Sequence, residues 1–151
     1  MKVLNLEEAM GVALEEAKQA IRHEDVPVGA LIIVDKYVIA SRHNERQLTG
    51  DPTAHAEILA LRDAAAELGA WYLDKATLVT TLEPCPMCAG AALNARVAHV
   101  VFGAHDPKAG ATETLYNLLA DPRLNHQAQI TSGVLADECG EILSNFFRDR
   151  R

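Results

Sequence analysis

The stretch ATLVTTLEPCPMCAGAALN, residues 76–94, decides the fold, because it joins a short strand to a helix through two cysteines. Residues 76–81 form an apolar run of strand length, and residues 86–94 are rich in small side chains and begin with Pro86, which suits a first helical turn. Cys85 and Cys88 are three positions apart at the start of this predicted helix, so both sulfurs lie on one helical face. A helix N-terminus also lowers the thiol pKa and favours the thiolate form that binds metal ions.

On both sides of this stretch, helical and extended patterns alternate. Helices are predicted over 6–21, from 51–53 to about 69, over 86–94, around 115–119 and over 137–150, and strands over 28–34, 37–40, 76–81, 97–102 and 128–134. Asn5 and Glu8 form a capping-box pattern, and Asp35-Lys36 is typical of a hairpin turn. An early hairpin followed by strands that helices separate predicts a mixed sheet with helices on its faces.

The length and composition of the chain limit its class. With 151 residues, 49% of them hydrophobic, we expect a single domain over residues 1–151 that buries its own core. No apolar run approaches the ~20 residues that span a bilayer, and the first residues lack a secretory pattern, so we expect a cytoplasmic protein without membrane contact. Three cysteines argue against a disulfide framework.

The net charge of −7 disfavours general binding to polyanions. The chain nevertheless ends in Arg148-Asp149-Arg150-Arg151, so basic groups are present at one end. Any contact with nucleic acid should therefore be local and driven by shape, with few phosphates neutralised.

The motif His55-Ala56-Glu57 supplies the groups that the two cysteines lack. One imidazole and two thiolates are ligands that zinc prefers, and a site with three protein ligands keeps its fourth position for water, whose pKa zinc can lower to roughly 7. Glu57 is the candidate general acid and base. Positions two apart point to different sides of a helix, so spacing alone leaves open whether Glu57 reaches the water.

Each motif taken alone has a simpler interpretation. A lone Cys-x-x-Cys is often a redox pair or half of a structural zinc site, and a lone histidine is often a capping or surface residue. The sequence holds neither a second Cys-x-x-Cys nor a His-x₃₋₅-His that would complete a structural site. Together, His-x-Glu followed by Pro-Cys-x-x-Cys is the signature of zinc nucleobase deaminases.

At these residues the chain resembles the cytidine-deaminase-like superfamily and, more narrowly, the bacterial tRNA-specific adenosine deaminases. The zinc motifs specify only the superfamily, whereas later segments point to the tRNA enzymes. The resemblance rests on VPVGA 26–30, DPTAHAE 51–57, TLEPC 81–85, VVFGA 100–104, DPKAGA 106–111, Asn125-His126, LADEC 135–139 and FFR 146–148. One departure is Val79-Thr80, where an aromatic-containing strand is expected.

The resemblance implies a three-layer α/β/α sandwich around a five-stranded mixed sheet, usually assembled as a homodimer. It implies one Zn²⁺ per chain with His55, Cys85 and Cys88 as ligands, and Glu57 as the proton shuttle. The substrate would be the wobble adenosine of a tRNA anticodon stem-loop, with no DNA substrate expected. The residues matching positions near the RNA are Asn44, Asp106, Lys108, Asn125, His126, Phe147 and Arg148; of Phe146 and Phe147, we expect one to face the core.

Two other functions remain open at this stage. A zinc deaminase of free nucleobases or nucleosides would share the same chemistry, although the 106–108 loop and Asn125-His126 argue against it. A non-catalytic RNA-binding subunit that keeps zinc for structure would be expected to lack the shuttle carboxylate, and Glu57 is present.

Overall fold

The structure, a computed structural model, describes residues 1–150 of the chain. Its elements are α1 (Leu6–Lys18), the 3₁₀ helix η1 (Gln19–His23), β1 (Gly29–Val34), β2 (Tyr37–His43), α2 (Arg46–Thr49), α3 (Ala56–Leu68), β3 (Thr77–Leu82), α4 (Pro86–Asn94), β4 (His99–Ala104), the 3₁₀ helix η2 (Leu118–Ala120), β5 (Gln129–Thr131) and α5 (Ala136–Arg148). No helix within residues 1–150 has the length and apolar character needed to cross a membrane.

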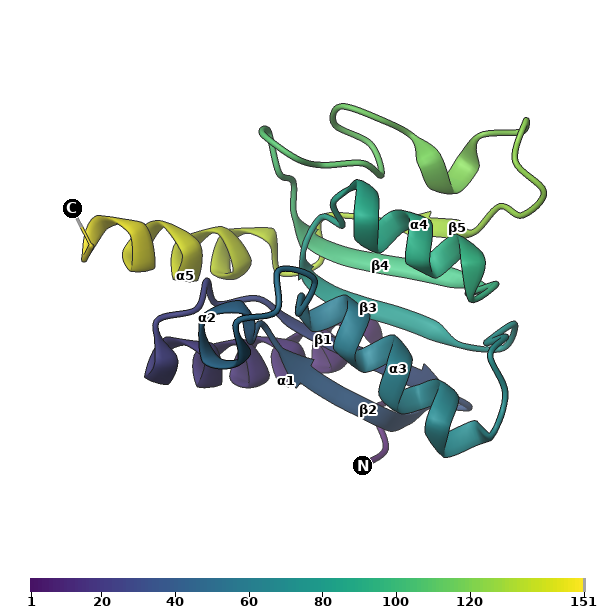
Figure 1. Cartoon of the computed structure of the whole chain (residues 1–151), viewed down its shortest axis with the longest axis horizontal. Coiled ribbons are helices and arrows are strands. Elements are labelled where there is room, and N and C mark those ends of the chain that lie inside the picture. Colours follow the sequence, from purple (N-terminus) through teal and green to yellow (C-terminus); the bar gives the residue numbers. More distant parts are fainter. Residues whose placement is uncertain (151) are drawn as a thin grey trace.

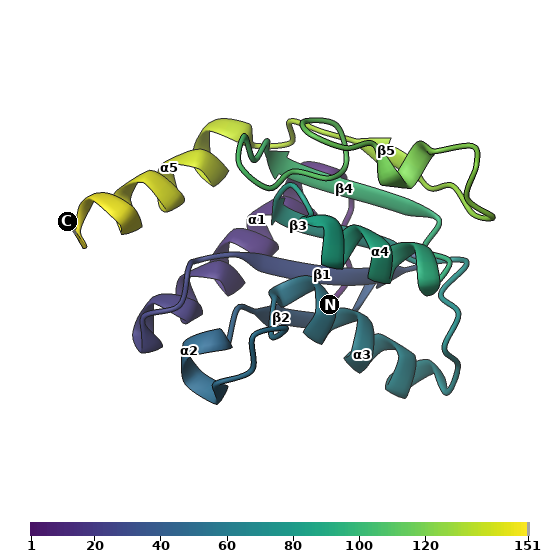
Figure 2. The same cartoon turned by 45° about the horizontal axis from the view of Figure 1, so that its top comes forward.

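The five strands form one mixed sheet in the order β2-β1-β3-β4-β5 (Figure 1). β1 pairs antiparallel with β2 and β3, whereas β3, β4 and β5 run parallel. The helices α3 and α4 cover one face of the sheet and α1 covers the other (Figure 2). The predicted three-layer sandwich around a five-stranded mixed sheet is therefore confirmed.

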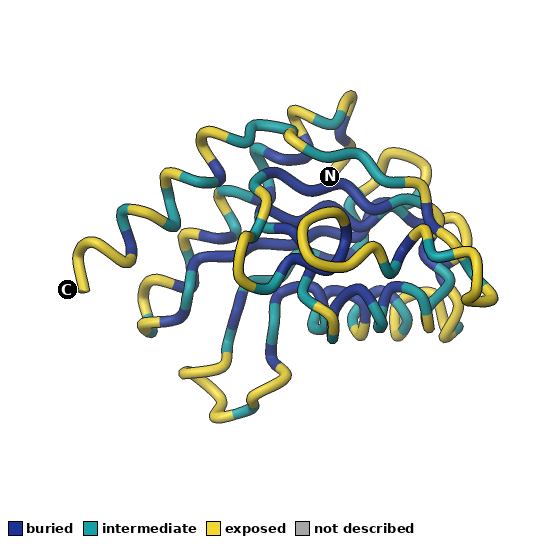
Figure 3. Tube along the Cα trace, turned by 90° about the horizontal axis from the view of Figure 1, so that it is seen from above, coloured by how far each residue is buried: buried dark blue, intermediate teal, exposed yellow. Residues whose placement is uncertain are grey.

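The strands are buried between the helices (dark blue in Figure 3), and an apolar cluster lies on each face of the sheet. Between the sheet and α3 and α4, small residues such as Ala60 and Ala89 pack against Leu78 and Val100. On the other face, α1 and the start of α5 pack against β1, β3 and β4, with Cys139 fully buried. Small side chains on the helices let their backbones approach the sheet closely.

Local sequence signals explain several element boundaries. The Asn5 side chain accepts a hydrogen bond from the Glu8 amide at 2.8 Å, which caps α1 as predicted. Asp35 and Lys36 both have positive φ angles, the backbone of a tight hairpin turn. Gly69, with φ 66°, ends α3 where the sequence predicts.

Several predicted elements differ from the structure. The helix predicted around 115–119 is only the 3₁₀ turn η2 (Leu118–Ala120), and the strand predicted over 128–134 shortens to β5 (Gln129–Thr131). The second predicted helix begins at Ala56 rather than at 51–53, because the Asp51 carboxylate accepts hydrogen bonds from the Thr53 amide and hydroxyl and closes a turn instead. The fourth predicted strand, 97–102, instead spans His99–Ala104, so Gly103 lies inside β4. A Cβ at this position would come within 2.3 Å of the Cys139 sulfur, so glycine permits the close approach of α5.

Gly29 makes a testable contribution to this packing. A Cβ at Gly29 would lie 2.0 Å from the carbonyl oxygen of Ala13, within the backbone of α1, so Gly29→Ala must displace that helix. We expect it to lower the free energy of unfolding by about 2 kcal/mol or more, measured by urea denaturation.

Gly11→Ala is the matched control, because a Cβ there meets nothing within 4 Å and Gly11 lies inside α1. It should raise the free energy of unfolding by about 0.5–1 kcal/mol, since alanine favours helix over the unfolded chain. Equal stability of Gly29→Ala and the parent protein would contradict the role given to Gly29.

Candidate active site and metal centre

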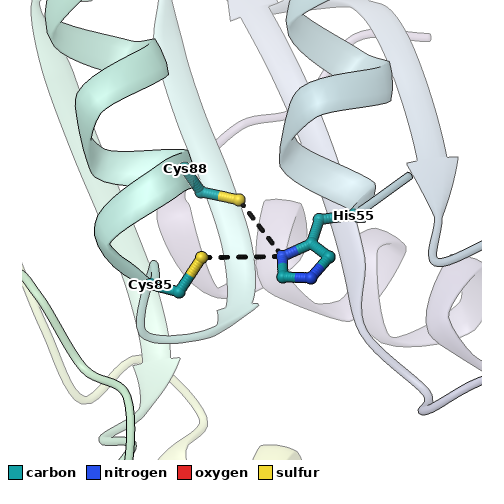
Figure 4. Close-up of side chains that lie close together, drawn as sticks. All are labelled: His55, Cys85 and Cys88. Carbon is teal, nitrogen blue, oxygen red and sulfur yellow. Dashed lines mark hydrogen bonds between the residues drawn. The ribbon is translucent and has the colours of Figure 1, made fainter. Parts of the chain in front are cut away.

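His55, Cys85 and Cys88 converge at the starts of two neighbouring helices. His55 immediately precedes α3, Cys85 immediately precedes α4, and Cys88 lies in the first turn of α4. The Nδ1 atom of His55 lies 3.6 Å from the Cys85 sulfur and 3.4 Å from the Cys88 sulfur (Figure 4). Their ligand atoms all lie within 4.8 Å of one another, so the three residues form a group that could hold a metal ion.

The side chains of His55, Cys85 and Cys88 shift one another's pKa values. A hydrogen bond with Cys88 and another with His55 lower the pKa of the Cys85 thiol to about 4, although burial opposes this shift. The pKa of Cys88 is raised by the same bond to Cys85 and by burial, and the hydrogen bond with Cys85 raises that of His55 against the effect of burial. A thiolate is thus favoured at Cys85, which is the form that binds metal ions.

Glu57 lies beside this group and is 4% exposed. Its Oε1 atom accepts a hydrogen bond from the Thr80 hydroxyl at 2.9 Å, and its Oε2 atom lies 3.3 Å from the Cys88 sulfur, which donates to it. Burial raises the pKa of the Glu57 carboxyl. His55 has an extended backbone outside the helix, so the periodicity that separates positions 55 and 57 on a regular helix does not apply.

Thr80 is a site residue that the sequence interpretation missed. The sequence marks it only as part of the Val79-Thr80 departure from the expected aromatic-containing strand. Its side chain is fully buried and its hydroxyl has two acceptors within reach, Glu57 Oε1 and the carbonyl of Leu82 at 3.1 Å. Alternation along β3 could have shown only that Thr80 and the apolar Leu78 share one face of the sheet.

Of these groups, His55, Glu57 and Cys85 line a cavity of about 250 Å³ at the end of β3. The cavity is bounded by the loop before β1, the segment after β2, the starts of α3 and α4, and the loop after β4. Its lining residues are Glu24, Asp25, Val26, Val28, Asn44, Arg46, Gln47, His55, Glu57, Leu82, Glu83, Cys85, Asp106 and Ala109. Of the predicted RNA-contacting residues, Asn44 and Asp106 therefore lie at the same pocket as the predicted metal ligands His55 and Cys85.

Asn44 joins three of the segments around this cavity. Its side-chain oxygen accepts a hydrogen bond from the Ala56 amide at 2.8 Å, and its side-chain amide donates to the Val26 carbonyl at 2.9 Å. Asn44 is 8% exposed. Its two hydrogen bonds hold the start of α3 against the loop before β1. This contact fixes where His55 and Glu57 stand relative to the pocket wall.

Glu83 organises the loop after β4 and was also given no role from the sequence. Its carboxylate is 2% exposed and accepts hydrogen bonds from the amides of Asp106, Thr112, Glu113 and Thr114 at 2.8–3.1 Å and from the Thr114 hydroxyl. Asp106 in turn accepts from the amides of Lys108 and Ala109 at 2.9 and 3.2 Å, which closes the tip of the loop. Burial alone would raise the pKa of Glu83, but these bonds lower it to about 2.

The remaining predicted RNA contacts fall into two separate places. Lys108, Phe147 and Arg148 line a larger groove between this loop and α5, and the groove shares Val26, Leu82 and Asp106 with the pocket. Phe146 is buried and Phe147 is 48% exposed, so the expectation that one of the pair faces the core is confirmed.

Asn125 and His126 lie elsewhere. Asn125 accepts a hydrogen bond from the Arg96 guanidinium at 3.3 Å, and the His126 Nε2 atom donates to the Val97 carbonyl at 2.8 Å. Both partners precede β4, whereas the pocket lies where β3 and β4 end. Within one chain, these two residues therefore stand at the other end of the sheet from His55.

The chain is similar in sequence to known deaminases. The family model of the MafB19-like deaminases matches residues 4–151. The tRNA-specific adenosine deaminase of Bacillus subtilis is 51% identical over 142 residues, covering 94% of this chain and 88% of its own length. The enzyme of the same name from Haemophilus influenzae is 45% identical over 146 residues, covering 96% and 84%.

Two solved structures share the fold. A structure from work on A-to-I editing by tRNA:A34 deaminases at the wobble position superposes with a TM-score of 0.85 at 42% identity, covering 89% of this chain and 97% of the other. A guanine deaminase from Nitrosomonas europaea superposes with a TM-score of 0.86 at 26% identity, covering 97% and 86%.

The buried Glu83 carboxylate predicts a specific pH dependence of stability. Because its pKa is depressed to about 2 from an ordinary 4.5, the charged form stabilises the folded protein fully above about pH 4.5, and this stabilisation is lost as the pH falls toward 2. Glu83→Gln should therefore be less stable than the parent by about 2–4 kcal/mol at pH 7, and the difference should shrink below pH 4.5.

The measurement is urea denaturation of both proteins from pH 7 to pH 3. Glu113→Gln serves as the control, because it removes a partly exposed carboxylate from the same loop while the backbone amide that Glu83 uses remains. A difference between Glu83→Gln and the parent that does not change with pH would contradict the assignment.

Proposed function

This chain belongs to the family of tRNA-specific adenosine deaminases, and we propose that it converts adenosine to inosine by hydrolysis at the wobble position of tRNA anticodons. The observation that carries the proposal is the meeting of His55, Cys85 and Cys88 within 4.8 Å, beside a buried carboxylate. We further propose that residues 1–151 act as one deaminase domain and that the enzyme works in the cytoplasm, as suits a tRNA-modifying protein.

We propose Zn²⁺ as the metal, one ion per chain, held by His55, Cys85 and Cys88. The donor set supports zinc, because zinc binds thiolate sulfur together with imidazole nitrogen and because Cys85 favours the thiolate form. When bound, zinc supplies a Lewis acid that makes water nucleophilic near neutral pH.

Glu57 carries the protons of the reaction. Its carboxylate takes a proton from the attacking water and delivers it to ring N1 of adenine, which makes C6 more electrophilic. A second proton goes through Glu57 to the 6-amino group, which leaves as ammonia, so adenosine and water give inosine and ammonia. The Thr80 hydroxyl holds one carboxylate oxygen, and the other oxygen faces the metal-ligand group.

The RNA-binding proposal follows the placement of the predicted contacts. Asn44 and Asp106 act at the pocket that receives the base, and Lys108, Phe147 and Arg148 act in the adjoining groove. Asn125 and His126 lie at the other end of the sheet, so their proposed contact belongs with the proposed homodimer, in which a second copy can bring this segment to its partner's pocket.

A deaminase of free nucleobases is the second candidate, supported by the structural similarity to a guanine deaminase. The test is incubation of the zinc-loaded protein with an anticodon stem-loop, unmodified tRNA, free adenosine, free cytidine and free guanine, with ammonia release and sequencing for inosine as readouts. We expect inosine at the wobble position and no ammonia from the free compounds. Ammonia from guanine alone would overturn the tRNA assignment.

The role of Glu57 is tested by Glu57→Gln, which keeps the shape of the side chain but removes its ability to carry a proton. We expect zinc to remain at one per chain, measured by elemental analysis, while turnover of the stem-loop falls about 10²–10⁴-fold. Glu67→Gln, an exposed change on the same helix, should leave turnover unaffected. Near-parental turnover of Glu57→Gln would show that another group moves the protons.

A further inference from the structure

Asp25 is a buried carboxylate at the pocket for which the proposed reaction has no use. It is 2% exposed and lies in the loop between η1 and β1. Its Oδ1 atom accepts a hydrogen bond from the Gln47 amide at 2.8 Å, and its Oδ2 atom accepts from the Leu48 amide at 3.2 Å and from the His23 ring at 2.5 Å. A buried carboxylate is retained only where such partners offset its loss of hydration.

The two amides belong to the first turn of α2, a helix of one turn that the sequence did not predict. Glu45, the residue that precedes it, provides no side-chain cap, so Asp25 satisfies amides that the helix leaves free. Because Asp25 is 22 residues away in the chain, the placement of α2 depends on a tertiary contact. α2 stands at the same end of the sheet as the start of α3 (Figure 1).

The first residue of α2 is Arg46, whose exposed side chain lines the mouth of the pocket. Carboxylates dominate that lining, at positions Glu24, Asp25, Glu57, Glu83 and Asp106. Among the described lining residues, Arg46 is the sole lysine or arginine. An RNA strand that places a base in this acidic pocket needs a cation for its phosphate, and Arg46 is the one available at the mouth.

The neighbouring groove carries its cations on the other side of the pocket. Lys108 and Arg148 line it between the loop after β4 and α5, whereas Arg46 follows β2, the strand at the other side of β1 and β3; Arg150 also lines the groove but is paired with Glu24 at 2.7 Å. A nucleotide within a strand has one phosphate on each side of its sugar. The groove can bind the backbone on one side of an inserted nucleotide and Arg46 the backbone on the other.

We propose that Asp25 is a positioning residue that holds α2 in place, so that Arg46 binds a phosphate flanking the target nucleotide. This inference rests on the proposed RNA substrate. It identifies the side chain at the pocket that neutralises a phosphate of that RNA. Arg46 contributes to binding of the RNA strand and not to the chemical step, and Asp25 acts only through Arg46.

The first experiment measures steady-state kinetics of the zinc-loaded protein on an anticodon stem-loop at several KCl concentrations. We expect Arg46→Gln to raise KM about tenfold with kcat within about twofold, because one charged contact is lost from binding. Binding of a labelled stem-loop should show a salt slope smaller by about 0.7, the value for one phosphate of a single strand. Arg46→Lys should keep most of that slope.

Arg62→Gln is the matched control, since Arg62 is an exposed arginine on α3 that does not line the pocket. We expect it to leave KM and the salt slope unchanged. An Arg46→Gln protein with parental KM and parental salt slope would overturn the phosphate contact.

The second experiment tests whether Asp25 acts through Arg46. Asp25→Asn keeps an acceptor for Gln47 but turns an N–H group toward the Leu48 amide, so α2 should lose its position. We expect KM to rise about three- to tenfold in the parent background and by less than twofold in the Arg46→Gln background. Equal effects in both backgrounds would overturn the positioning role.

Folding and substrate identity are controlled separately. Should Asp25→Asn unfold, Asp25→Glu, which retains the carboxylate on a longer side chain, takes its place in the double-variant comparison. If the parent protein makes no inosine in the stem-loop, the proposed function fails, whereas the binding measurement still decides whether Arg46 contacts a phosphate.

Discussion

The buried carboxylate of Glu83 is the interaction on which the arrangement of the site depends. Glu83 lies between β3 and α4, two residues before Cys85, and its oxygens accept hydrogen bonds from four backbone amides and one hydroxyl of residues 106–114. A Cβ at Gly110 would come within 2.3 Å of this carboxylate, so the loop approaches it as closely as glycine permits. One buried charge thereby sets the distance between the metal-ligand cysteines and Asp106.

Nearly all of the buried polar residues lie at the end of the sheet that holds Glu83 and the metal-ligand group. Within residues 1–150, the buried polar residues are Asp25, Asn44, Glu57, Thr80, Thr81, Glu83 and Thr112, and the other buried residues are apolar. Most of them bind backbone groups of another segment, as Thr81 does when its hydroxyl accepts from the Gly29 amide at 3.1 Å. Such contacts are costly to break, since each partner would remain buried without a hydrogen bond. The protein thus holds its site by polar contacts between loops and its sheet by apolar packing.

The sheet topology explains why these loops meet. β1 runs antiparallel to both β2 and β3, so the start of β1 lies beside the ends of β2 and β3. β4 runs parallel to β3 and therefore ends at the same end of the sheet. The segments 24–28, 44–55, 83–85 and 104–114 consequently converge there. Residues far apart in sequence, such as Asn44 and Asp106, share one pocket for this reason alone.

Local patterns predicted the elements well where short-range physics decides them. The capping pattern at Asn5, the hairpin at 35–36 and the Pro86 start of α4 all depend on neighbouring residues, and all are confirmed. The sequence predicts the start of α3 too early and does not predict α2. At α3, Asp51 closes a local turn with Thr53, and Asn44 caps the helix at Ala56 from another segment. At α2, Asp25 satisfies the first amides from 22 residues away.

The chain by itself determined the mixed sheet, the helices on its faces and the identity of the groups able to bind a metal, because periodicity, turn residues and ligand chemistry are properties of short segments. Tertiary structure alone decided that Glu57 lies beside the two cysteines, that Thr80 binds its carboxylate and that Asn125 stands at the far end of the sheet. These outcomes depend on distances between segments that meet only when the strands pair, and no local pattern encodes such distances.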